Sequence, residues 1–175
     1  RVLFRSKNVK NGGFWFQLLQ IVTNIVIVIY CGVGNVKRRF QMLTFDVNWI
    51  AIAVLVIANM ALGAIWYGPL FGKPWMEATG IKMDDMEGKN MMPPYAVAIM
   101  NSFFMAFFMA NVIAWTSTAS LGGGLLLGLF MWLGFTGLSF GVNHAFEMRS
   151  LHLWFINSGM YLIGLLIMGA VLAIW

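Results

Sequence analysis

One short polar stretch has residue types and a spacing that could perform chemistry. His144 and Glu147 stand three residues apart, between Asn143 and Arg149. If one helix runs through both, their side chains share a face, and the pair suits two metal ligands or an acid and a base acting at lipid headgroups. The alternative is a solvated helix end in which Glu147 pairs with Arg149, His144 or a lysine of the preceding loop.

The remaining sequence offers this stretch little chemical support. No further cluster of His, Asp or Glu supplies the other ligands of a metal site. The sequence also contains no Gly-rich phosphate loop, no Gly-x-Ser-x-Gly elbow and no His-Glu-x-x-His pair. We therefore assign no catalytic, cofactor-binding or metal-ligating residue, and we expect no cofactor.

Asparagines are the polar side chains that recur within the apolar parts of the chain. Asn48 and Asn59 share a helical face in one apolar segment, Asn101 and Asn111 lie in the next, and Asn157 lies in the last. Asparagine does not titrate near neutral pH and does not attack carbonyl groups. Inside a membrane it suits interhelical hydrogen bonds, each worth about 0.5 to 2 kcal/mol. The alternative role is a polar path for a permeating molecule or a ligand.

The apolar segments themselves must position these side chains. The chain is 61% hydrophobic and 10% charged, with a mean hydropathy of +0.81, which a soluble domain of this size cannot bury. Each apolar segment has about 20 residues or slightly more, enough for a helix to cross a hydrocarbon layer of ~30 Å. The strands of a β-barrel would alternate apolar and polar residues, and these segments are continuous. We therefore predict an all-α polytopic transmembrane helix bundle with helices at about 47–70, 95–115, 121–142 and 153–175, and a further apolar segment at 14–33.

Residues 1–41 are set apart from this four-helix core. Met42 stands just ahead of the first core helix, so residues 42–175 form the predicted transmembrane domain. Segment 14–33 is either an extra N-terminal helix, a cleaved signal, or part of an upstream extension that does not belong to the native protein. The bulky Tyr30 beside Cys31 argues against cleavage, which requires small residues.

The basic residues predict an orientation in the membrane. If the chain has five helices, eight of its eleven basic residues lie on one side of the membrane. If the protein starts at Met42 and has four helices, four basic residues lie on that side and none on the other. Both counts place the 71–94 and 143–150 loops in the cytoplasm and the C-terminus outside, in what we expect to be the bacterial inner (plasma) membrane. The basic residues form no stripe, so no nucleic acid is expected as a partner. The expected partners are the lipid bilayer and either a second copy of the chain or another membrane protein.

The first core helix leaves the membrane through an aromatic segment. Trp66, Tyr67, Pro69 and Trp75 are predicted to be interfacial anchors that direct the following loop across the membrane surface. A short helix is expected in that loop, from about Pro74 to a stop at glycine. Small residues recur every four positions in the later helices, and we expect them to mark contacts between helices of the same chain.

The chain also resembles a known family. The resemblance covers 47–175 and rests on short motifs: 48–49, 63–75, 131–135, 146–150 and 156–159. These residues are similar to those of the domain of unknown function 1761 family of small bacterial and fungal membrane proteins. The resemblance implies a four-helix integral membrane unit without an established activity, and the segment before Met42 has no counterpart in the pattern.

Two functional hypotheses follow. The first is a non-enzymatic membrane protein, either a small transport or permeation component or a partner-binding membrane subunit. The alternative is a membrane-interface enzyme that acts on lipid through His144 and Glu147. The two differ in where they place the important side chains: the first relies on the asparagines inside the bundle, and the second on the polar stretch at its edge.

Overall fold

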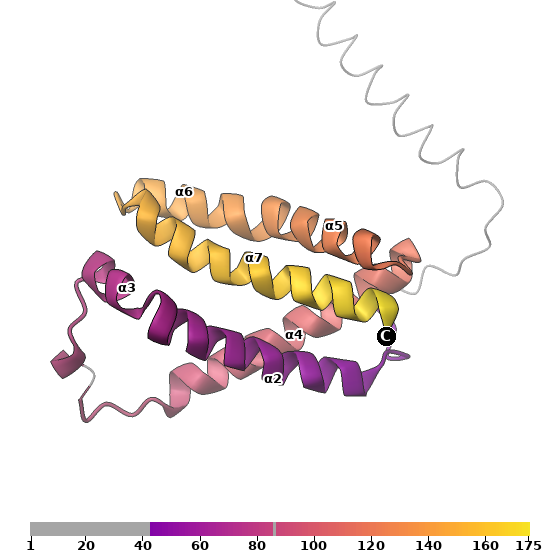
Figure 1. Cartoon of the computed structure of the whole chain (residues 1–175), viewed down its shortest axis with the longest axis horizontal. Coiled ribbons are helices and arrows are strands. Elements are labelled where there is room, and N and C mark those ends of the chain that lie inside the picture. Colours follow the sequence, from indigo (N-terminus) through magenta and orange to yellow (C-terminus); the bar gives the residue numbers. More distant parts are fainter. Residues whose placement is uncertain (1–42, 86) are drawn as a thin grey trace, which may run out of the picture. The chain divides into compact units, whose positions relative to one another are not determined.

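The structure, a computed structural model, describes residues 43–85 and 87–175 (Figure 1). The apolar segment 14–33 lies outside the described residues. The described part of the chain is helical and contains no strand, which confirms the predicted all-α class. Four of its helical stretches are long and apolar enough to cross a membrane: Trp49–Leu70, Met92–Thr116, Leu121–Phe146 and Leu151–Ile174.

Two of these four stretches are composite. The first joins α2 (Trp49–Ile65) to the π-helix η1 (Trp66–Leu70). The third joins α5 (Leu121–Met131), the π-helix η3 (Trp132–Gly137) and α6 (Leu138–Phe146). The second and fourth are continuous α-helices, α4 (Met92–Thr116) and α7 (Leu151–Ile174). With 22 to 26 residues each, the four stretches are about 33 to 39 Å long and exceed a hydrocarbon layer of ~30 Å.

Local sequence explains where the helices begin. The side chains of Asn48, Ser120 and Ser150 each accept a hydrogen bond from the backbone N–H three residues later, at 3.0, 3.2 and 3.2 Å. These are N-cap bonds, which satisfy a donor that the first turn leaves unpaired. α4 instead carries Pro93 and Pro94 in its first turn, where a missing N–H costs nothing.

The π-helix η1 forms around Pro69. Proline has no N–H to continue the α-helical hydrogen bonds, and the backbone N–H of Phe71 reaches five residues back to the Trp66 carbonyl at 2.8 Å. Pro69 therefore widens the last turn of the span, and the helix ends at Leu70. In η3 the indole of Trp132 lies so close to Gly137 that a Cβ there would approach the ring to 2.8 Å.

Glycines bring α5 and α7 into backbone contact. A Cβ on Gly124 would lie 2.7 Å from the carbonyl carbon of Gly169, and one turn later a Cβ on Gly128 would lie 2.9 Å from that of Leu165. In lipid the hydrophobic effect does not drive helices together, so helix association there depends on close packing of this kind. The predicted contact role of the small residues is thus confirmed for this pair of helices, which lie side by side in Figure 1.

A second pairing joins α2 to α4. The fully buried Asn111 of α4 accepts a hydrogen bond from the backbone N–H of Thr44 at 2.7 Å, and its amide donates to the carbonyl of Phe107 at 3.0 Å. The ring of Trp49 stacks on that of Phe107 with centroids 5.9 Å apart. Asn111 therefore holds the segment that leads into α2 against α4. α4 also contacts α7 (Figure 1).

The loop after the first span contains the expected short helix. α3 covers Gly72–Thr79 and ends at Gly80, whose φ of 74° lies in the left-handed region that glycine adopts without strain. A 3₁₀ turn, Met83–Asp85, follows before the chain enters α4. α3 also contacts α7, so this part of the loop is held against the bundle.

Candidate functional site

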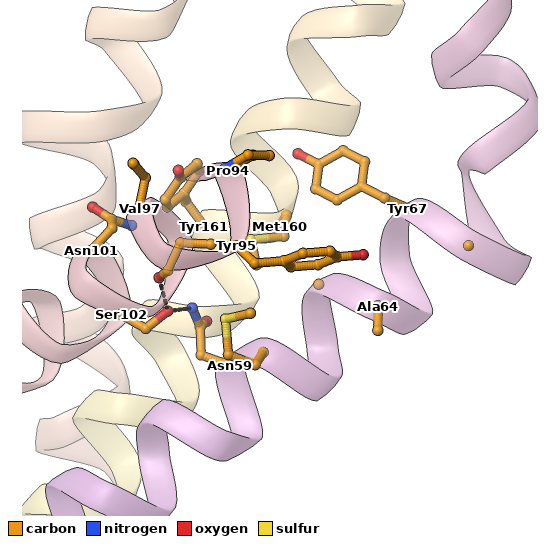
Figure 2. A pocket seen from close by; sticks show the side chains of 14 residues that line it. Asn59, Ala64, Tyr67, Pro94, Tyr95, Val97, Asn101, Ser102, Met160 and Tyr161 are labelled. Atoms are coloured by element: carbon orange, nitrogen blue, oxygen red, sulfur yellow. Dashed lines mark hydrogen bonds between the residues drawn. The ribbon is translucent and has the colours of Figure 1, made fainter. Parts of the chain in front are cut away.

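A cleft of about 670 Å³ lies between α2, α4 and α7 (Figure 2). Pro94 and Tyr95 stand in the first turns of α4, and Tyr67 and Gly68 belong to η1, so one end of the cleft lies at the helix ends that flank the 71–94 loop. Its other end reaches Asn59, halfway along the stretch Trp49–Leu70. Its described lining carries amide and hydroxyl groups and no charged side chain; the polar members are Asn59, Tyr67, Tyr95, Asn101, Ser102 and Tyr161.

A hydrogen bond between two helices closes the deep end of the cleft. The amide nitrogen of Asn59 on α2 donates to the hydroxyl of Ser102 on α4 at 2.7 Å, and that hydroxyl donates to the carbonyl of Ala98 at 2.8 Å (Figure 2). Asn59 is 7% exposed and Ser102 is 1% exposed, so this bond replaces water for both groups. The predicted asparagine thus has an interhelical partner, which the sequence alone did not identify.

The other atom of the Asn59 amide points toward α7. Its carbonyl oxygen is buried and has no hydrogen-bond partner among the described residues. A Cβ on Gly164 would lie 2.7 Å from this oxygen, so the absence of a side chain at that position makes room for it. Asn59 therefore contacts α4 with one end of its amide and α7 with the other, at mid-depth of the bundle.

At the mouth of the cleft, two aromatic side chains donate hydrogen bonds to one asparagine. The Tyr67 hydroxyl and the Trp75 indole N–H both donate to the side-chain oxygen of Asn157, at 3.4 and 3.2 Å. The Tyr67 and Trp75 rings meet edge to face, with centroids 5.8 Å apart. Asn157 thus connects α7 to η1 and α3, and Tyr67 and Trp75 bind protein groups; their interfacial role remains a prediction.

Three tryptophans bind backbone carbonyls across the bundle. The indole of Trp66 donates to the carbonyl of Ile156 at 2.9 Å, and that of Trp132 donates to the carbonyl of Ser158 at 2.8 Å. In the reverse direction, Trp154 of α7 donates to the carbonyl of Gly137 at 2.9 Å. Each π-helix is therefore hydrogen-bonded to residues 154–158 of α7 through its first or last residue.

The structure places His144 and Glu147 in different surroundings at the edge of the bundle. α6 ends at Phe146, so the helix that would have given His144 and Glu147 a shared face stops between them. His144 is 8% exposed and its Nδ1 lies 2.9 Å from the carbonyl of Phe140, while its Nε2 has no hydrogen-bond partner in the described chain. Glu147 is about half exposed and forms an ion pair with Arg149, as the solvated alternative predicts.

The other predicted residues have separate positions. Asn48 caps α2 at the opposite end of that helix from the cleft mouth, and Asn143 is exposed in the last turn of α6. Asn101 lines the cleft, is exposed, and donates from its amide to the sulfur of Met105 at 3.2 Å. Among residues 43–85 and 87–175, no three His, Cys, Asp or Glu side chains gather in a group that could hold a metal ion.

Sequence reasoning missed several residues of the cleft. Ser102 gave no signal beyond its place among the small residues that recur every four positions, although Ser102 and Asn59 each stand about halfway along their helices. Tyr95 carried no signal beyond its position after two prolines. The apolar run around Trp132 likewise gave no indication that its indole would bind a neighbouring helix.

Comparison with known proteins gives one result. The family model described as "Protein of unknown function (DUF1761)" matches residues 50–173. This range contains all residues that line the cleft, and it confirms the resemblance drawn from the sequence motifs. No curated protein and no solved structure matches the chain.

Proposed function

Because the chain belongs to the DUF1761 family, whose function is unknown, we propose its function from the geometry of the cleft. We propose a non-enzymatic integral membrane protein that takes up a small uncharged molecule between α2, α4 and α7. It would act as a small transport or permeation component, or as a membrane subunit that presents this molecule to a partner.

One observation carries the proposal: a cleft whose lining includes amide and hydroxyl groups, called the polar cleft below, runs from the loop end of the helices to the middle of the first long stretch. Its volume of about 670 Å³ lies within the range of about 300 to 1,000 Å³ that ligand sites occupy. Polar groups at membrane depth are costly and are retained for a partner or a passenger. With amides and hydroxyls and no charge in its described lining, the cleft favours an uncharged molecule that forms hydrogen bonds.

The charge distribution supports an orientation for this cleft. Lys73, Lys82 and Lys89 lie in the loop at its mouth, and basic loops are retained on the cytoplasmic side. We propose that residues 71–94 and 143–150 face the cytoplasm of a bacterial inner membrane and that the C-terminus lies outside. The cleft would then open toward the cytoplasm.

Cysteine accessibility tests both the cleft and its orientation. In a Cys31→Ser background, Ala64→Cys places a thiol in the lining, and Ala61→Cys places one on the exposed face of the same helix outside it. We expect a membrane-impermeant methanethiosulfonate reagent to label Ala64→Cys from the cytoplasmic side only, and to leave Ala61→Cys unlabelled because lipid covers it.

Two results would count against the proposal. Equal and slow labelling of Ala64→Cys and Ala61→Cys from both sides would mean that water does not enter the cleft. Labelling of Ala64→Cys from the outside alone would reverse the proposed orientation while keeping the cleft. Both variants replace an exposed alanine in α2, so neither substitution disturbs the packed helix faces.

A further inference from the structure

A second cavity adjoins the polar cleft. It has a volume of about 460 Å³ and lies between α4, α7 and the π-helix η3 with the end of α5. Its walls are mostly aromatic and sulfur-containing side chains, among them Phe104, Phe108, Met131 and Phe135. Asn101 and Tyr161 line both this cavity and the polar cleft, so the two spaces meet at these two residues.

The two spaces follow one face of α4. Val97 and Asn101 line the polar cleft, and Asn101, Phe104 and Phe108 line the apolar cavity. Steps of four, three and four residues keep these side chains on a single helical face. Along this face the amide of Asn101 is followed by the aromatic rings of Phe104 and Phe108, which is the direction in which a lipid changes from headgroup to tail.

The residues at the junction have polar atoms that the protein does not use. Asn101 is exposed about ten residues into α4, and its one side-chain hydrogen bond goes to the sulfur of Met105, a weak acceptor. Its carbonyl oxygen and the Tyr161 hydroxyl have no hydrogen-bond partner in the described part of the chain. Such groups are costly in a membrane without a partner, so both are available to an external hydrogen-bonding group.

The charge of the lining restricts what that group can be. Neither described lining contains a charged side chain, so a phosphate or carboxylate headgroup would lie there without a cation. We propose, on the basis of the function proposed above, that this groove binds one uncharged single-chain amphipathic lipid. Its hydroxyl-bearing head would bind Asn101 and Tyr161, and its tail would lie along α4 against Phe104, Phe108 and Phe135.

The test uses a photoactivatable monoacylglycerol with a diazirine in its acyl chain, and the full chain in phosphatidylcholine nanodiscs. We expect cross-links at Phe104, Phe108 and Phe135, reduced by excess unlabelled monoacylglycerol. The same acyl chain as a free fatty acid carries a charge and should give about tenfold less cross-linking at these positions, which corresponds to about 1.4 kcal/mol of binding free energy.

Three variants separate specific binding from ordinary contact with lipid. Thr136→Phe narrows the apolar cavity, and Asn101→Leu removes the head contact at an exposed position that the fold does not depend on. Each should lower the competed cross-linking about tenfold. Leu133→Phe enlarges an exposed side chain of η3, the helix that contains Thr136, but outside the cavity, and should leave cross-linking unchanged.

The lipid inference and the proposed function fail by different results. Cross-links spread evenly over the outer faces of the helices, with all three variants equal to the parent protein, would overturn the lipid inference. Stronger cross-linking of the fatty acid than of the monoacylglycerol would overturn it as well. The labelling of Ala64→Cys reports separately on entry of water into the polar cleft and depends on neither probe.

Discussion

The glycine contact between α5 and α7 gives a sharp prediction for Gly124→Ala. The new Cβ would lie 2.7 Å from the carbonyl carbon of Gly169 and 2.8 Å from the Cβ of Ala173. Carbon atoms in favourable contact stand about 3.5 to 4.0 Å apart, so the two helices would have to separate by about 1 Å. Both obstacles are backbone or a short side chain, and neither can rotate away. Overpacking of this kind costs about 1 to 3 kcal/mol.

The matched control is Gly122→Ala, two residues earlier on the same helix. Gly122 is exposed, and a Cβ there would meet no atom within 4 Å. Alanine favours a helix over glycine by up to about 1 kcal/mol, and this gain is common to both variants. The difference between their free energies of unfolding therefore isolates the clash, and we expect Gly124→Ala to be less stable than Gly122→Ala by about 1 to 3 kcal/mol.

The measurement is unfolding in mixed micelles of dodecyl maltoside and increasing dodecyl sulfate, followed by far-ultraviolet circular dichroism. Gly122→Ala should unfold at the same dodecyl sulfate fraction as the parent protein or at a higher one. Gly124→Ala should unfold at a lower fraction. Equal unfolding of the two alanine variants would refute the close backbone contact between α5 and α7.

Three further predictions concern the hydrogen bonds around the cleft. Ser102→Ala removes the partner of the Asn59 amide, and a double-mutant cycle with Asn59→Ala should give a coupling of about 0.6 to 1.7 kcal/mol; zero coupling would contradict the bond. Gly164→Ala forces the Asn59 side chain to move and should cost about 1 kcal/mol in the parent protein but close to nothing in an Asn59→Ala background; an equal cost in both backgrounds would contradict this. Asn157→Leu removes the acceptor of the Trp75 indole, so the free energy needed to detach α3 from α7 should fall by about 1 kcal/mol. Because proteolysis follows the population of the detached form, cleavage within the 71–94 loop should become about fivefold faster; an unchanged rate would show that α3 is held by other contacts.

The four long apolar helices could be predicted from sequence because the thickness of a bilayer sets the length that an apolar helix needs to cross it. The predicted segment 47–70 is observed as Trp49–Leu70, with its start set by the Asn48 cap. The third helix was expected to end at 142 and extends to Phe146. The polar Asn143 and His144 lower the local hydropathy, but His144 is buried and the helix continues through it.

The cleft could be predicted only in part, because its residues come from helices whose neighbours the sequence does not reveal. Asn59 could be recognised as a polar residue within a long apolar segment, whereas its partner Ser102 depends on the crossing of α2 and α4. Asn48 shares the helical face of Asn59 and was considered with it, yet it serves as an N-cap. Tyr161 could be recognised as a polar partner of Asn157 four residues earlier, but only the packing of α7 brings it to the lining of the same two cavities as Asn101.

The two π-helices also bear on how chain length can vary among relatives. A π-helical turn contains one residue more than the α-helical turn it replaces, and each residue of an α-helix turns the following ones by about 100°. Because the wider turn absorbs the extra residue, its loss within Trp132–Gly137 would restore a continuous α-helix without turning α6 by that angle, and His144 would stay on the face it now buries. A one-residue gap at either π-helix in an aligned relative would thus mark a regular α-helical turn at that place, with the same inward face for the rest of that helical stretch.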